Sequence, residues 1–114
     1  RRTARRVIVG PEHTVRFQVK GHVFRNVRIT NLSDQGCFAM VNQGHVALFV
    51  QGTPLEDFAF EHPDLALGPI VARVRYVLGG TGDATFEFMG VGIHFAGMDE
   101  ASARTLAEFL ARMA

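Results

Sequence analysis

Hydrophobic residues alternate with polar residues along several short stretches of the chain, a period of two that is typical of β-strands with one buried face. The first two stretches cover residues 14–20 and 22–30. A turn at Gly21 separates them, so together they predict a β-hairpin. Cys37–Val41 and Val46–Val50 are predicted as two further short strands.

The composition changes in the middle of the chain. Residues 51–69 are rich in proline, glycine and carboxylates, and we expect a loop there with only a short strand at Phe58–Phe60. In Ile70–Leu78 the even-numbered residues alternate with Val71, Arg73, Arg75 and Val77, which predicts a strand whose even-numbered residues share one face.

A second hairpin is predicted at the end of the β-rich region. Gly79–Asp83 supplies turn residues, and a final strand is expected from Thr85 to about Phe95. Two glycines lie within this strand, Gly90 and Gly92, and they predict a bulge or the close approach of another backbone.

The hydrophobic period changes to 3.6 after Gly97, which predicts one C-terminal helix over residues 99–113, capped by Asp99. About six short strands followed by one helix predict a mainly β fold. We expect a small antiparallel β-barrel of about six strands, or a sandwich, with the helix plugging its open end. The barrel with its helix is expected to cover residues 10–114, preceded by an N-terminal arm or linker over residues 1–9.

Length and composition fit this picture. The 114 residues allow one domain, and ten Phe with no Trp predict a core built around phenylalanine. No apolar run is long enough to span a membrane, and no signal peptide is recognisable, so we expect a cytoplasmic setting. The single Cys37 rules out an internal disulfide.

Positive charge is concentrated at one end of the sequence. Arg1, Arg2, Arg5 and Arg6 are four of the 12 basic residues, which leaves eight basic and eleven acidic residues in the rest of the chain. Such a cluster suits a compact polyanion better than a nucleic acid polymer, which favours a broad basic face.

Two segments carry the candidate chemistry. The first is the arginine cluster, because a guanidinium can hold phosphate oxygens or a guanine edge bidentately and can stack on a base. The second is Asn31-Leu32-Ser33-Asp34-Gln35-Gly36, where Asn31 and Ser33 offer short polar groups and Gly36 permits a positive φ. Taken singly, the first segment could be a solvated basic tail and the second an ordinary turn.

In this order the two segments resemble the paired motifs of the PilZ domain family, an Arg-x-x-x-Arg arm and an (Asp/Asn)-x-Ser-x-x-Gly turn. Val91-Gly92-Ile93-His94-Phe95 is similar to the last strand of that family, so the resemblance covers essentially the whole chain. It implies a receptor for cyclic di-GMP that is not an enzyme and needs no cofactor or metal.

The implied ligand-binding residues are Arg1, Arg2, Arg5, Arg6, Asn31, Ser33 and Gly36. Both Arg1/Arg5 and Arg2/Arg6 have the motif's spacing, and we favour Arg2/Arg6 because Arg6 directly precedes the apolar run. Binding is expected to change the conformation of the arm relative to an upstream domain or a protein effector, and so to control motility, biofilm or polysaccharide output. The alternative is a PilZ-like protein-interaction adaptor that does not bind the ligand.

Other candidate sites are weaker. The five histidines lack the spacing of metal ligands and are expected on the surface or in strands, with His94 a candidate to face the ligand. Cys37 is expected to pack as a small apolar residue rather than to act as a nucleophile. The carboxylates of residues 56–64 are expected to be solvated.

Overall fold

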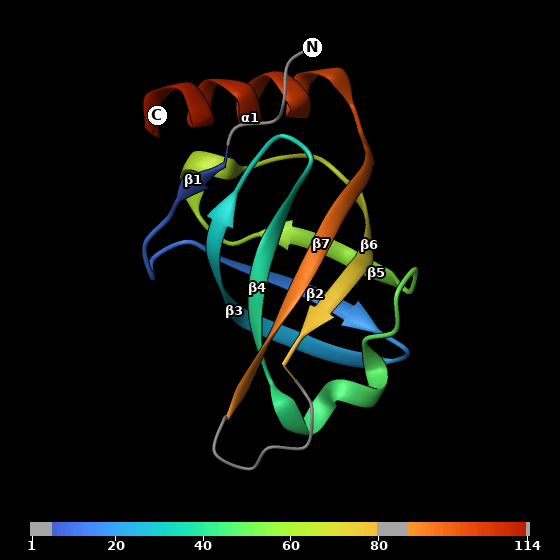
Figure 1. The fold of residues 1–114 in the computed structure, drawn as a ribbon. Coiled ribbons are helices and arrows are strands. Elements are labelled where there is room, and N and C mark those ends of the chain that lie inside the picture. The colour runs from blue at the N-terminus through green and yellow to red at the C-terminus, as the bar shows by residue number, and fades with distance from the viewer. Residues whose placement is uncertain (1–5, 80–86, 114) are drawn as a thin grey trace.

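The computed structural model describes residues 6–79 and 87–113 (Figure 1). Its elements in chain order are β1 (Val7–Ile8), β2 (Thr14–Val19), β3 (His22–Leu32), β4 (Gly36–Asn42), the 3-10 helix η1 (Gln43–Leu48), β5 (Pro54–Phe60), the 3-10 turn η2 (Pro63–Leu65), β6 (Ile70–Leu78), β7 (Phe88–Met98) and the α-helix α1 (Glu100–Met113).

The strands form a closed antiparallel barrel. Their order is β3-β2-β5-β6-β7-β4, and β4 pairs with both β7 and β3, so the six strands make a complete ring. β1 is an additional strand that pairs with the end of β3. The predicted fold class, a mainly β barrel of about six strands with a C-terminal helix, is confirmed.

Aromatic side chains fill the barrel. Phe17 is 2% exposed and its ring contacts those of Phe24, Phe49 and Phe58 at centroid distances of 5.3, 6.0 and 6.3 Å. Phe58 in turn contacts Phe95 at 5.7 Å, which extends the cluster to β7. The core is therefore built around phenylalanine, as the composition predicts. Val7 and Val9 of the predicted arm are buried in the same core.

The strand predicted at Val46–Val50 is wrong, because the chain forms η1 there. The Asn42 side chain accepts a hydrogen bond from the Gly44 amide at 2.8 Å and starts a turn. Both edges of β4 are already paired, with β3 and with β7, so the closed barrel offers the segment that follows β4 no free strand edge to pair with. The segment is a continuous apolar run, of which Phe49 is buried in the core while Val46 and Val50 are 37% and 55% exposed.

The loop predicted between residues 51 and 69 is also wrong in part, because β5 has seven residues rather than three. Asp57 has a φ of 53° at a point where the pairing with β2 shifts, from Gln18 opposite Glu56 to Arg16 opposite Ala59. This extra residue is a β-bulge that breaks the alternation of buried positions and conceals the strand from a period-two reading.

The predicted hairpin turn at Gly79–Asp83 lies outside the described residues except for Gly79, and so does residue 85. β7 runs further than predicted, to Met98, because Gly97 and Met98 pair with β6. Of the two features predicted for Gly90 and Gly92, a bulge is present in β6 opposite Gly92, where the pairing shifts between Val74 and Tyr76, but the close neighbours of both glycines are side chains and not another backbone. A Cβ there would lie 2.0 Å from the Phe38 ring and 2.5 Å from the Tyr76 ring, respectively.

Helix α1 covers one end of the barrel (Figure 1). Asp99 caps it as predicted, since its carboxylate accepts a hydrogen bond from the Ser102 amide at 2.7 Å. This bond lowers the pKa of Asp99. The Ser102 hydroxyl accepts a bond from the Gly68 amide at 2.8 Å, and Leu106 and Phe109 are buried beneath the helix. No helix in the described part of the chain is long and apolar enough to cross a membrane.

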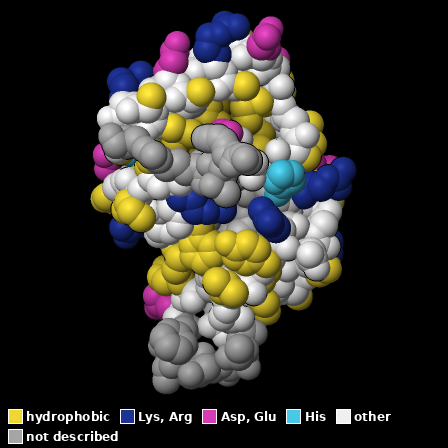
Figure 2. Space-filling model, turned by 45° about the horizontal axis from the view of Figure 1, so that its top comes forward, with side chains coloured by type: hydrophobic (Ala, Val, Ile, Leu, Met, Phe, Trp, Pro, Cys, Tyr) yellow, Lys and Arg dark blue, Asp and Glu magenta, His cyan; other side chains and the backbone are white. Residues whose placement is uncertain are grey.

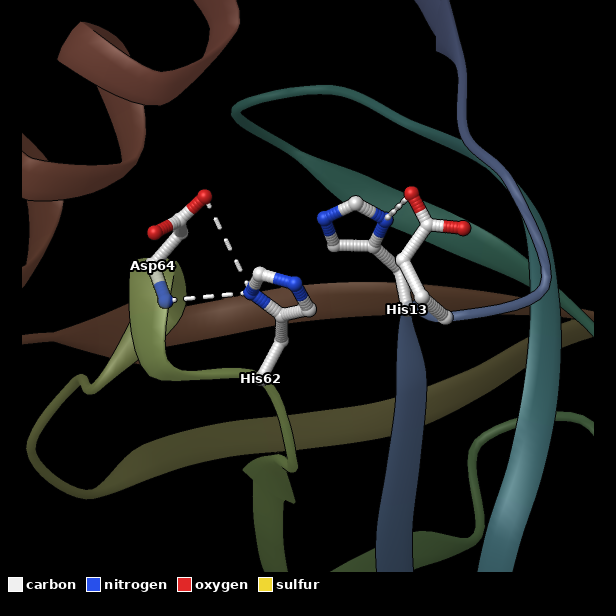
Figure 3. Close-up of polar contacts among 4 residues, drawn as sticks. His13, His62 and Asp64 are labelled. Atoms are coloured by element: carbon white, nitrogen blue, oxygen red, sulfur yellow. Dashed lines mark hydrogen bonds and ion pairs between the residues drawn. The ribbon is translucent and has the colours of Figure 1, made fainter.

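A pair of histidines supports this helix (Figure 3). His13 is 5% exposed, so the expectation of surface or strand histidines fails for it. Its ring stacks on that of His62 with 4.2 Å between the ring centroids and packs edge-on against the Phe109 ring with 5.3 Å between the centroids. His62 caps η2, because its Nδ1 accepts a hydrogen bond from the Asp64 amide at 3.1 Å. Burial, and secondly the neighbouring His62, lower the pKa of His13.

We predict that acid weakens the barrel through His13. Because the pKa of His13 is lowered in the folded state, this histidine binds a proton more readily in the unfolded chain. The contribution of neutral His13 to the free energy of unfolding is therefore present above the ordinary histidine pKa of about 6.5 and is lost as the pH falls below that value. The free energy of unfolding, measured in urea, should therefore decrease between pH values of about 7.5 and 5.5. His13→Phe should reduce this decrease, whereas His22→Gln at an exposed position should leave it unchanged. An equal decrease in His13→Phe and the wild type would contradict the assignment.

Candidate functional site

The polar segment that joins β3 to β4 is a tight turn held by its own backbone. Asn31 and Leu32 belong to β3, so the turn is shorter than predicted and covers residues 33–35. The Ser33 amide donates to the Gly36 carbonyl at 2.8 Å, and the Ser33 hydroxyl accepts from the Gln35 amide at 3.1 Å. The Gln35 carbonyl accepts from the Phe95 amide at 2.8 Å, which fastens the turn to β7.

Gly36 is required by space and not by a positive φ, so the reason given for it from the sequence is wrong. Its φ lies outside the left-handed region. A Cβ at this position would lie 1.9 Å from the Ile93 carbonyl oxygen and 3.3 Å from the His94 Cα. β7 therefore passes against the first residue of β4 at a distance that only glycine permits.

The end of the arginine cluster reaches this turn. β1 pairs with β3 so that Ile8 lies opposite Asn31, and this places Arg6 beside the same strand. An Arg6 Nη1 donates a hydrogen bond to Asn31 Oδ1 at 2.7 Å. Arg6 also lies close enough to Cys37 for its charge to oppose the effect of burial, which raises the pKa of that thiol to about 12. Cys37 is buried, as predicted for a small apolar residue, and stays protonated at neutral pH.

The structure thus brings Arg6, Asn31, Ser33 and Gly36 together at one end of β3 and β4. Arg1, Arg2 and Arg5 lie outside the described residues, so the choice between the two spacings stays a prediction. Within the described ranges, no group of three His, Cys, Asp or Glu residues is placed to hold a metal ion.

An apolar surface on β6 and β7, which extends away from the turn toward the opposite end of β4, was not predicted. Tyr76, Leu78 and Phe88 are 37%, 57% and 51% exposed, and the Phe38 ring lies 6.2 Å from that of Tyr76. Figure 2 shows hydrophobic side chains gathered on one face with basic side chains along a border of the patch. The alternation of the sequence placed Tyr76 and Leu78 on one face with Val74, but the pairing of β6 with β7 shifts between Val74 and Tyr76, so Val74 is buried while Tyr76 and Leu78 are exposed.

Comparison with known proteins assigns the family. The family model described as PilZ domain matches residues 1–112, so the chain belongs to the PilZ domain family. A search of curated proteins gives no match.

Solved structures share the fold. The K. pneumonia MrkH complex with c-di-GMP superposes with a TM-score of 0.78 at 18% sequence identity, over 97% of this chain and 51% of that one. Apo MrkH superposes with a TM-score of 0.80 at 19% sequence identity, over 99% of this chain and 50% of that one. The PilZ domain of YcgR from Escherichia coli with c-di-GMP superposes with a TM-score of 0.75 at 14% sequence identity, over 99% of this chain and 91% of that one. The present chain spans about half the length of the MrkH chains it matches.

We predict that Gly36→Ala destabilises the fold by about 1–3 kcal/mol, the usual cost of forcing an extra methyl group into a packed site. Gly97→Ala is the matched control in β7, because a Cβ there would meet only Val71 at an ordinary 3.9 Å. The measurement is urea unfolding followed by circular dichroism. Equal stability of the Gly36 variant and the wild type would refute the close approach of β7.

Proposed function

We propose that this PilZ domain is a receptor for cyclic di-GMP and binds it on the outer face of the barrel at the β3–β4 turn. One observation carries the proposal: the 2.7 Å hydrogen bond between Arg6 and Asn31, which joins the two polar segments across 25 positions of sequence. Family membership and the c-di-GMP complexes of MrkH and YcgR with the same fold support the choice of ligand.

The chemistry of the residues suits this ligand. Cyclic di-GMP presents two phosphodiesters and two guanine bases, and a stacked dimer of it presents twice as many. Arg1, Arg2, Arg5 and Arg6 would hold phosphate oxygens or guanine edges through their planar guanidinium groups. Asn31 can accept and donate beside them, and its bond to Arg6 already holds that guanidinium at the turn.

The role proposed is regulatory and not enzymatic. Ligand binding would change the geometry of residues 1–9 relative to an upstream domain or a protein effector, and so control motility, biofilm or polysaccharide output in the cytoplasm. The second candidate function, a PilZ adaptor that contacts a partner without the ligand, is favoured by one feature. This feature is the exposed apolar surface around Tyr76 and Leu78.

We predict that the full chain binds cyclic di-GMP in isothermal titration calorimetry and that Arg6→Ala weakens the affinity. One charge-assisted hydrogen bond contributes about 1.5–3 kcal/mol, which corresponds to roughly a 10- to 150-fold increase in Kd. The Kd of Arg6→Lys should lie between those of the wild type and Arg6→Ala, because lysine keeps the positive charge but lacks the planar guanidinium group. Arg2→Ala should resemble Arg6→Ala if the favoured spacing is the one used, whereas Arg1→Ala and Arg5→Ala would then have smaller effects.

Arg104→Ala is the matched control, because this exposed arginine on α1 is not one of the candidate ligand-binding residues and its loss changes the net charge by the same amount. Its Kd should equal that of the wild type. Absence of any binding heat with the wild type would reject the receptor function and leave the adaptor as the better candidate. Equal weakening in the Arg104 and Arg6 variants would mean that net charge alone drives binding.

A further inference from the structure

His94 lies on the outer face of β7 in line with the turn. Its neighbours Ile93 and Phe95 are 2% and 7% exposed and point into the core, so His94 points outward. Across β4 it pairs with Gly36, whose carbonyl binds the Ser33 amide. His94, Gly36 and Ser33 therefore form one cross-strand row, in which Ser33 is buried and His94 is half-buried, at the same end of β3 and β4 as the contact between Arg6 and Asn31.

The middle position of this row has no side chain. Gly36 lacks a Cβ and the Ile93 carbonyl oxygen takes its place, so the neighbour of His94 on β4 is backbone and not a side chain. His94 Nδ1 is buried, and no group within residues 6–79 or 87–113 forms a hydrogen bond with it. A buried ring nitrogen without a bond is costly, and no hydrogen bond at Nδ1 fixes this half-buried ring, so it can turn to present a nitrogen to a polar ligand beside the turn.

We propose that His94 is a further ligand-binding residue of this domain, which donates a hydrogen bond to a phosphate of cyclic di-GMP beside the β3–β4 turn and takes up a proton as the ligand binds. The inference rests on the proposed function. It adds a titratable residue, outside the arginine arm and the polar turn, that makes the affinity for the messenger depend on pH.

The charges around His94 come from three sides. On β6 its cross-strand partner is the exposed Arg73, which opposes a second positive charge. On β4, the Cys37 thiol next to Gly36 is buried with a pKa raised to about 12, so it is neutral. The turn carries the exposed Asp34, and Arg6 lies across it. With cations on two sides, the phosphate is the anion that would favour the protonated ring.

Histidine is the side chain that usually changes charge between pH values of about 5 and 8. A phosphodiester beside it stabilises the imidazolium, so binding takes up a proton and the affinity rises as the pH falls through this range.

The experiment is calorimetric titration of the full chain with cyclic di-GMP at pH values of about 6, 7 and 8, each in two buffers of different ionisation enthalpy. The wild type should bind several-fold more tightly at the lowest pH and should take up protons. His94→Gln should weaken binding at the lowest pH by about 10-fold, the loss expected for one charge-assisted hydrogen bond, and should abolish most of the proton uptake. His22→Gln, at an exposed position in the β2–β3 hairpin, is the control and should behave as the wild type.

The outcomes separate the two proposals. If the wild type binds and His94→Gln keeps both its affinity and its pH dependence, the role of His94 is overturned while the receptor function stands. Failure of the wild type to bind overturns both. His94→Phe serves as the second variant: retained affinity and pH dependence there would overturn the proton-linked contact and indicate ring stacking. Thermal unfolding of each variant by circular dichroism shows that the comparison is made between folded proteins.

Discussion

Closure of the barrel through β4 is the constraint on which the rest of the structure depends. β4 pairs with β3 on one side and β7 on the other, so the ring has no free edge and β1 can add only at the end of β3. Closure also forces β7 against the first residue of β4, where the Ile93 carbonyl leaves room for glycine alone. The polar turn, the end of the arginine cluster and β7 meet at one place because of this geometry.

Most of the fold could be predicted from the sequence, because alternation reports a strand wherever one face is buried and the pairing is regular. β2 and the first part of β6 follow this rule, and the change to a period of 3.6 marks the helix in the same way. The prediction failed where the period was broken or misleading. Asp57 inserts one residue into β5 and hides that strand, while the short apolar run Val46–Val50 lies in a segment that no strand can pair with. Bulges and the availability of a pairing edge are properties of the whole sheet, which a local pattern does not contain.

The candidate site was predictable to the extent that it depends on local motifs. Asn31, Ser33 and Arg6 are found together, as the resemblance to PilZ domains implies. The role of Gly36 was misjudged because its constraint comes from β7, more than fifty residues later in the chain. Burial of His13 was missed for a similar reason, since the helix and the stacked His62 that cover it are distant in sequence.

The two glycines of β7 have a consequence for how this surface can evolve. The Phe38 ring occupies the place of a side chain at Gly90, and the Tyr76 ring does the same at Gly92. Each glycine and its ring share one volume on the outside of the barrel, so enlarging one member requires shrinking the other. Across related sequences these two pairs should covary, with large residues at 90 or 92 appearing alongside small ones at 38 or 76. Such exchange would redistribute the apolar surface without altering the barrel beneath it.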